Sequence, residues 1–453
     1  MSQNIVLKKG LNIPIKGESE LRVSKSIAPG IIAIQPTDFK GLLPRLLVKE
    51  GDPVLCGSPV IADKKNSDIL LTSPASGVVK EIVRGDKRKL LAVLIAVDPE
   101  QKCVDFGAIN PEKADADEIR AAILGSGLWP WLVQRPYGVI ADPAIKPKSI
   151  FISAFNTAPL AADAEFCYGG QLKAIQAGVT ALSKLTDGKV HVSLCACKGG
   201  ESAFANLQDA ELHTFAGKHP AGNVGVQISH IAPIQKGDTV WTISLMGVAA
   251  IGNLLLNGKL AARRKVAVCG PMAIEPSYIE TLPGMPMKDI AGYYGTLASE
   301  IRFISGDVLS GENIGENGYL GFYDDQITLI REGNERELFG WIRPIRYKQF
   351  STDHSYFSWL MPWRKYDMDT NLHGGPRAFL MNDNYYAKVL PMDIYPLYLA
   401  KACLAGDIDK MEKFGIYEVL PEDLALCEFV DPSKNNIQEM IAKGIDLMLK
   451  EMA

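Results

Sequence analysis

The hydrophobic pattern of the chain changes near residue 115, and this change limits what the chain can fold into. Before it, short aliphatic runs such as Val60–Ala62 and Leu90–Val97 alternate with turns, which is typical of a small all-β unit. After it, an amphipathic stretch over Gly170–Leu185 precedes an apolar run over Val190–Cys195, which predicts alternating helices and strands. The chain is therefore expected to combine an all-β start with an α/β domain.

Composition agrees with a multidomain globular protein. The 453 residues predict about three domains at roughly 150 residues per domain. With 47% hydrophobic and 22% charged residues, the chain can bury a large core, so the disordered, collagen-like and coiled-coil classes are excluded. The 48 basic and 52 acidic residues give a net charge of -4 without a local basic block, which argues against nucleic-acid binding.

The pattern after the α/β segments predicts two further units. A connecting helix is expected over Leu254–Ala261, and strands over Lys265–Gly270 and Arg302–Gly306 enclose a small β-rich module. A helical tail with proline and glycine stops follows. The predicted domains cover residues 1–104, 105–261, 262–335 and 336–453.

The eight cysteines do not indicate a disulfide framework, which favours a reducing compartment. The closest pair, Cys195 and Cys197, is expected to consist of buried free thiols, because no second pair stands at zinc or iron-sulfur spacing. The N-terminus lacks the apolar region of a signal peptide. Polar residues and glycines interrupt the longest apolar stretch, Val240–Leu256, so no membrane-spanning helix is expected.

Two segments are candidates for a nucleotide-binding glycine loop. Gly125–Trp131 begins like the dinucleotide motif, but its proline and two tryptophans fill the space where the backbone must approach a phosphate. Gly252–Leu260 has leucine where a P-loop needs a hydroxyl for Mg2+. Gly200–Phe204 also lacks the last glycine of a nucleophile elbow. The sequence therefore predicts no phosphate-binding loop and no hydrolase chemistry at these segments.

The densest group of candidate ligand residues lies between residues 213 and 230. Three histidines stand among small, turn-forming residues at the place where α/β folds put ligand sites, and a neutral imidazole there can hydrogen-bond a ligand carbonyl. The alternative is that Gly217, Gly222 and Gly225 only satisfy tight turns. No metal motif such as H-E-x-x-H is present, so no metal site is predicted. The candidate ligand loop comprises His213, Phe215, His219, Gly222, Gly225 and His230.

A second conspicuous stretch, residues 355–366, combines aromatic and apolar residues with flanking basic ones. Such a stretch suits a partner interface or a contact with a membrane surface, because Trp and Tyr have apolar bodies with polar tips. Burial in the core of the chain is the alternative. The candidate contact residues are Tyr356, Phe357, Trp359, Trp363 and Arg364.

The first hundred residues are similar to biotinyl and lipoyl carrier domains. Gly51–Val54 and Gly85–Lys87 open two turns with Ser73–Val79 between them, as in that quasi-symmetric barrel. In carrier domains a lysine at the hairpin tip holds the cofactor, and Lys64 and Lys65 lie near the tip here. Because the methionines that flank the lipoyl lysine are missing, a hairpin of solvated lysines is the favoured interpretation.

Five segments spread over the chain resemble the NqrA proteins of the bacterial Na+-translocating NADH:quinone reductases. They are Lys8–Ile15, Phe215–Gly222, Ile304–Gly311, Arg331–Trp341 and Asp423–Val430. That family is similar in architecture to the RnfC protein of the Rnf complex and to the flavin-binding subunit of respiratory complex I. The family usually has a His-x-His pair where this chain has Gln227 and Ser229, so a role of that pair does not carry over.

The resemblance implies a multidomain α+β and α/β fold. An N-terminal biotinyl- or lipoyl-like barrel-sandwich domain would be followed by a degenerate Rossmann-like α/β domain without a flavin loop. A β-grasp SLBB module and a C-terminal mostly helical domain without iron-sulfur ligands would complete it. Only Cys427 remains where the relatives have repeated cysteine motifs, and a four-cysteine cluster cannot be built from it.

The resemblance also implies a function. It implies a peripheral, cofactor-free subunit on the cytoplasmic face of the bacterial inner membrane, in a complex that couples NADH oxidation and ubiquinone or menaquinone reduction to Na+ export. FMN, FAD, riboflavin and iron-sulfur clusters would belong to partner subunits, some of them integral to the membrane. This chain would contribute to docking on the membrane partners or to the quinone side of the complex, and it would have no activity of its own. The alternative is a stand-alone, divergent flavin- or nicotinamide-binding oxidoreductase.

Overall fold

A seven-stranded sheet lies at the centre of the computed structural model, which describes residues 3–294, 300–335, 346–352, 357–371 and 382–451. The strand order is β1-β14-β13-β12-β15-β10-β11, in which the first five strands are parallel and β10 and β11 are antiparallel. The strands are β1 (Asn4–Val6), β10 (Val133–Arg135), β11 (Val139–Ile140), β12 (Ile150–Ser153), β13 (Val190–Cys195), β14 (Glu211–Ala216) and β15 (Val240–Ser244).

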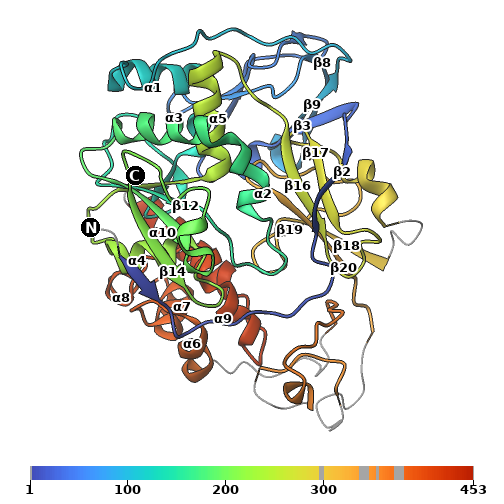
Figure 1. The fold of residues 1–453 in the computed structure, drawn as a ribbon, viewed down its shortest axis with the longest axis vertical. Helices are drawn as coiled ribbons and strands as arrows, with labels where there is room; N and C mark the ends of the chain where they lie inside the picture. Colours follow the sequence, from blue (N-terminus) through green and yellow to red (C-terminus); the bar gives the residue numbers. More distant parts are fainter. Residues whose placement is uncertain (1–2, 295–299, 336–345, 353–356, 372–381, 452–453) are drawn as a thin grey trace.

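Both faces of this sheet are covered, as the apolar character of its parallel strands requires. Ile150 and Ile152 point into a core shared with α1 (Ala116–Gly125), α3 (Leu172–Ser183) and α5 (Leu245–Asn257), whereas Phe151 points into a second core. That second core includes α4 (Val224–Ile231) and the C-terminal helices (Figure 1). The short helix α2 (Ala164–Tyr168) precedes α3.

Two small sheets form the expected all-β unit, in the orders β3-β9-β8-β5 and β4-β6-β7. Their inward side chains, among them Ile32, Val60 and Ile95, build a separate core. The strands are β3 (Ile31–Ile34), β4 (Pro44–Leu46), β5 (Pro53–Val54), β6 (Pro59–Asp63), β7 (Leu70–Thr72), β8 (Gly77–Arg84) and β9 (Leu90–Val97).

A six-stranded sheet in the order β19-β18-β20-β16-β17-β2 forms the third unit. Its edge strand β2 (Glu20–Ser26) comes from the N-terminus and pairs in parallel with β17. The N-terminal segment thus runs from the central sheet to this one, as the dark-blue trace in Figure 1 shows. The other strands are β16 (Arg264–Cys269), β17 (Ser277–Thr281), β18 (Ile301–Ser305), β19 (Glu312–Asn313) and β20 (Gln326–Arg331).

The C-terminal helices begin and end where proline and glycine predict it. Pro396 begins α7, and Gly406 and Gly415 take left-handed backbone conformations directly after α7 and α8. No helix among the described residues has the length and apolar character needed to cross a membrane. The helices are α6 (Asp383–Val389), α7 (Pro396–Ala405), α8 (Ile408–Phe414), α9 (Ala425–Val430) and α10 (Ile437–Glu451).

Most of the predicted elements are confirmed, but one is wrong. The strands over Leu90–Val97 and Val190–Cys195 have the predicted bounds, and the long helix covers Leu172–Ser183 within its predicted range. The helix expected over Leu254–Ala261 instead starts at Leu245 and ends at Asn257. No loop separates it from β15, because Ser244 both ends the strand and caps the helix by accepting a hydrogen bond from the Gly247 N–H.

Candidate functional site

A cavity of about 320 Å³ lies at the carboxyl edge of the parallel strands, where α/β folds commonly bind ligands. Ser153 and Ser244 end β12 and β15 at this edge and line the cavity. The six-stranded unit and the C-terminal unit close the other sides. Polar residues of its lining include Ser153, Asn156, His219, Thr242, Ser244, Asp307, Asp325 and Glu422.

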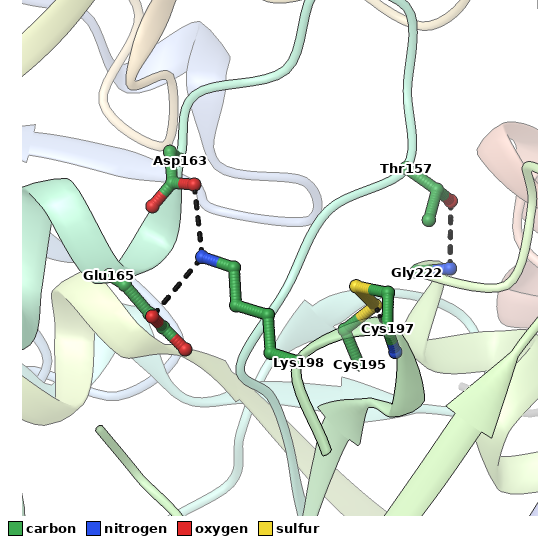
Figure 2. The surroundings of a disulfide bond; sticks show 7 residues. All are labelled: Thr157, Asp163, Glu165, Cys195, Cys197, Lys198 and Gly222. Atoms are coloured by element: carbon green, nitrogen blue, oxygen red, sulfur yellow. Dashed lines mark hydrogen bonds and ion pairs between the residues drawn. A yellow bond between two sulfur atoms is a disulfide. The ribbon is translucent and has the colours of Figure 1, made fainter. Parts of the chain in front are cut away.

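His219 is the histidine of the candidate ligand loop that lines this cavity, and it is buried. Its Nδ1 lies 3.1 Å from Thr157 Oγ1. The Thr157 hydroxyl also accepts a hydrogen bond from the Gly222 N–H at 2.8 Å, and Figure 2 draws this second bond. Burial lowers the pKa of His219 to about 4, although Asp307 and Asp423 act in the opposite direction. The imidazole is therefore neutral at pH 7 and interacts through hydrogen bonds.

Gly222 lies in a turn closed by the hydrogen bond from the Asn223 N–H to the Pro220 carbonyl, as the tight-turn interpretation expects, whereas Gly225 lies within α4, and both glycines also allow close packing. Neither has a positive φ. A Cβ on Gly222 would lie 2.6 Å from the Thr157 nitrogen, and one on Gly225 would lie 2.2 Å from Asp423 Oδ2. Gly217, with φ of +153°, does need glycine for its backbone conformation, and a Cβ on it would lie 2.9 Å from Leu7 Cβ.

Beside Gly225, a buried ion pair joins the central sheet to the C-terminal unit. Arg135 Nη1 lies 2.9 Å from Asp423 Oδ2, and Arg135 Nη2 lies 2.9 Å from Glu422 Oε1. The Arg135 and Asp423 side chains are 2% and 0% exposed, whereas Glu422 is 40% exposed. The pair therefore holds the cavity wall that Glu422 provides against the sheet.

The other residues of the candidate ligand loop do not meet at this cavity. His213 is buried in β14 with its Nε2 3.0 Å from His191 Nδ1, and Phe215 is buried in the core on the same strand. His230 is exposed near the end of α4, where its Nδ1 lies 2.9 Å from the Val226 carbonyl oxygen of its own helix. The structure thus separates the three histidines that the sequence placed in one loop.

Gln227 takes the position at which the resemblance leads one to expect the first histidine of a pair. Its amide is buried and donates hydrogen bonds to Ser153 Oγ at 2.8 Å and to the Ala221 carbonyl at 3.1 Å. These bonds connect α4 to the end of β12 and to the Pro-Ala-Gly loop. Ser229 instead bonds the Val226 carbonyl of its own helix.

Two carboxylates of the cavity were missed by sequence reasoning. Burial raises the pKa of Asp325 to about 6, with a further contribution from Asp324, whereas Asp307 receives the amides of the turn that follows it. The adjacent acidic pair Asp324–Asp325 directly before the apolar strand β20 is the signal that could have indicated Asp325, whereas no comparable signal marks Asp307.

The Gly125–Trp131 segment is filled by side chains, as its two tryptophans predicted. Trp129 and Trp131 are buried, and Trp129 Nε1 donates to the Ala141 carbonyl at 2.7 Å. Trp131 packs on Phe322, with ring centroids 4.4 Å apart. A second, more apolar cavity of about 180 Å³ lies beside Trp131, between the central sheet and the two smaller β units, and Arg264 lies in its lining.

The expectation of buried free thiols at Cys195 and Cys197 is wrong. The two form a disulfide, and Cys197 is exposed, because β13 ends at Cys195 and the chain turns immediately at the edge of the sheet. Figure 2 shows the bond next to Lys198, whose ammonium reaches Asp163 and Glu165 at 3.2 and 3.1 Å. The six other cysteines are free.

The described part of the aromatic stretch is exposed at its bulky residues. Phe357 and Trp359 are each 46% exposed and Trp363 is 79% exposed. The Arg364 guanidinium lies 5.5 Å from the Tyr347 ring. The alternative of burial in the chain's own core is therefore wrong for these three apolar side chains, whereas Tyr356 lies outside the described residues.

Comparison with known proteins decides the family. Residues 5–98 match the NqrA N-terminal barrel-sandwich hybrid domain, residues 114–260 the NqrA second alpha/beta domain and residues 265–315 the NQRA C-terminal domain. The NqrA protein of the Na(+)-translocating NADH-quinone reductase of Tolumonas auensis is 38% identical, covering 97% of this chain and 98% of the relative. That of Neisseria meningitidis is 36% identical, covering 99% and 100%. The chain belongs to the NqrA family.

Within the NqrA family, a third relative shows the same extent of likeness. The Rhodopirellula baltica protein is 35% identical and covers 98% of both chains. Among solved structures, an NAD+-reducing [NiFe]-hydrogenase in the air-oxidized state has a TM-score of 0.35 and 14% identity over 49% of this chain and 47% of that chain. The sequence relatives therefore carry the family assignment, and the domain boundaries at residues 104, 261 and 335 stay predictions.

Proposed function

We propose that this chain is a peripheral subunit of a Na+-translocating NADH:quinone oxidoreductase, in which partner subunits carry the redox chemistry. The observation that supports this most strongly is the similarity, over nearly the whole chain, to proteins named as a subunit of such a reductase. A stand-alone dehydrogenase is not favoured, because relatives of the same length bear the subunit name. The complex would sit at the cytoplasmic face of the bacterial inner membrane and reduce ubiquinone or menaquinone.

We further propose that the chain binds no flavin or iron-sulfur cluster of its own. The buried Trp129 and Trp131 occupy the loop where a flavin phosphate would need free backbone amides. Cys427 is buried, and burial raises its pKa, whereas an iron-sulfur ligand must be a thiolate. FMN, FAD, riboflavin and iron-sulfur clusters are thus assigned to partner subunits.

The cavity beside His219 is the candidate place at which this chain contacts the quinone. The neutral imidazole of His219 and the hydroxyl of Ser244 offer hydrogen bonds to a quinone carbonyl. His219→Gln in the purified complex should raise the KM for quinone with a smaller change in kcat. His230→Gln is the matched control, since His230 is exposed and bonded to its own helix, and an equal effect of both variants would refute this contact.

For docking, the exposed aromatic residues Phe357, Trp359 and Trp363 are the candidate surface, with Arg364 beside them. Large exposed aromatic side chains near a cation favour a partner or a membrane interface. Replacement of Trp359 and Trp363 by serine should leave folding intact but weaken assembly. Ile274→Ser, at a residue that is 65% exposed elsewhere, is the control.

The decisive experiment is affinity purification of the chain from detergent-solubilised native membranes, followed by mass spectrometry. Recovery with several polytopic subunits and a flavin- and iron-sulfur-containing NADH dehydrogenase subunit is expected. Recovery of the chain alone would overturn the assignment. The isolated chain should also lack visible flavin or cluster absorbance, and stoichiometric FMN in it would favour the stand-alone oxidoreductase instead.

A further inference from the structure

Two buried histidines and a glutamate meet on one face of the central sheet, toward the end opposite the cavity. Glu211 and His213 lie two residues apart on β14, so their side chains point to the same face. His191 on β13 is in register with Glu211. This cross-strand arrangement brings three groups that can bind a metal together on rigid strands, and the described residues hold no other group of this kind.

The distances between the three groups fit one small cation. His191 Nδ1 lies 3.0 Å from His213 Nε2 and 3.8 Å from Glu211 Oε2, and all three ligand atoms lie within 4.8 Å of one another. Ligands about 2.0–2.1 Å from a tetrahedral Zn2+ are roughly 3.3 Å apart. The observed distances lie on either side of that value, so small side-chain movements would complete the geometry.

The surroundings hold both imidazoles in place. His213 and His191 are 1% and 8% exposed, respectively. Phe151 stacks on His191 with ring centroids 4.8 Å apart, and the Glu211 side chain is 31% exposed.

We propose that His191, Glu211 and His213 bind one Zn2+ ion, with the fourth coordination position left to water. Two imidazoles and one carboxylate form a ligand set that zinc uses where it keeps an open position. The site is independent of the quinone-side proposal, because it lies on other residues and at the other end of the strands.

Binding has a consequence for the N-terminal strand. The Gln3 N–H now donates to His213 Nδ1 at 3.3 Å, so the proton of the His213 ring is on Nε2 and is donated to His191 Nδ1. When zinc takes Nε2, this proton moves to Nδ1, where it faces the Gln3 N–H. The amide must then turn away, and the amino end of the N-terminal segment should loosen.

Zinc titration of the chelator-treated, untagged full chain tests the proposal. Calorimetry should show one tight site per chain, and Co2+ in place of Zn2+ should give the visible absorbance of a tetrahedral centre. Glu211→Gln, at a partly exposed residue, should weaken binding at least about as much as loss of an outer-shell partner does, roughly 10- to 100-fold. His230→Gln should leave the affinity unchanged. The proposal is overturned if no stoichiometric site appears or if Glu211→Gln binds as tightly as the parent chain.

Hydrogen exchange separates this site from binding at cysteines. Zinc should speed exchange in the N-terminal peptide that contains Gln3, and His213→Gln should abolish this change. Cys197→Ser should bind zinc like the parent chain. Loss of binding in Cys197→Ser, or an N-terminal peptide that does not respond to zinc, would overturn the assignment.

Discussion

Replacement of Asp423 by asparagine should weaken the contact between the C-terminal unit and the central sheet. The change leaves the guanidinium of Arg135 buried, with Glu422 as its remaining charged partner among the contacts described above. Removing one partner of a buried ion pair lowers the free energy of unfolding by roughly 3–5 kcal/mol. Because Glu422 still pairs with Arg135, we expect the lower end of this range, about 3 kcal/mol. An asparagine oxygen in the Oδ2 position can still accept from both Arg135 Nη1 and the Leu420 N–H, so the substitution removes the negative charge and places the amide group at the Oδ1 position.

Hydrogen exchange of peptides from α9 and α10 is the appropriate assay, because a multidomain chain need not unfold in one step. A loss of about 3 kcal/mol multiplies the local opening constant on the order of 100-fold. Glu422→Gln is the matched control, since its exposed carboxylate should contribute about 1 kcal/mol or less. The double variant Arg135→Met with Asp423→Leu should recover much of the loss. Equal exchange in Asp423→Asn and Glu422→Gln would refute the reasoning.

Three further predictions concern protons and sulfur. Burial lowers the pKa of His219 to about 4, whereas the pKa of this histidine in the unfolded chain is about 6.5. Between these two values the unfolded chain binds a proton that the folded chain does not, so the free energy of unfolding should fall as the pH decreases from about 6.5 toward 4. In urea unfolding, His219→Gln should reduce the dependence of the unfolding free energy on pH in this range. An unchanged pH dependence would contradict the prediction. Burial raises the pKa of Asp38 to about 7, so this carboxyl should cost stability as the pH rises from about 4 to 7. Asp38→Asn should therefore raise the Tm at pH 8 and not at pH 4. The non-reduced chain should be two hydrogens lighter than its sequence mass, with Cys195 and Cys197 alkylated only after reduction, whereas added mass at Lys64 or Lys65 would support a carrier domain.

Local patterns predicted the elements whose signals lie within one window of the sequence. The strands over Leu90–Val97 and Val190–Cys195 are continuous apolar runs between turns, and both have the predicted bounds. Gly406 and Gly415 mark helix ends because the residue after a helix favours a left-handed backbone. The tryptophans in Gly125–Trp131 indicated the filled loop because their volume leaves no room for a phosphate.

Contacts between segments that are distant in the chain could not be predicted from the sequence patterns. Strand β2 pairs with β17 more than 250 residues later, and Arg135 meets Asp423 across a separation of 288 residues. The candidate ligand loop looked like one site because its histidines are neighbours in the chain, yet strand alternation and burial direct His213 to His191 and His219 to the cavity. The Cys195–Cys197 bond depends on the turn that β13 makes at the sheet edge.

The sequence by itself determined the family, through the order of its motifs, and the all-β and α/β character and the loop filled by tryptophans, which depend on short-range periodicity and side-chain volume. Only the tertiary structure decided which side chains share a site. Hydrophobic burial specifies that a strand is covered but does not specify its partner, and the groups that meet at His219 and at His191 come from elements whose pairing is a property of the whole fold.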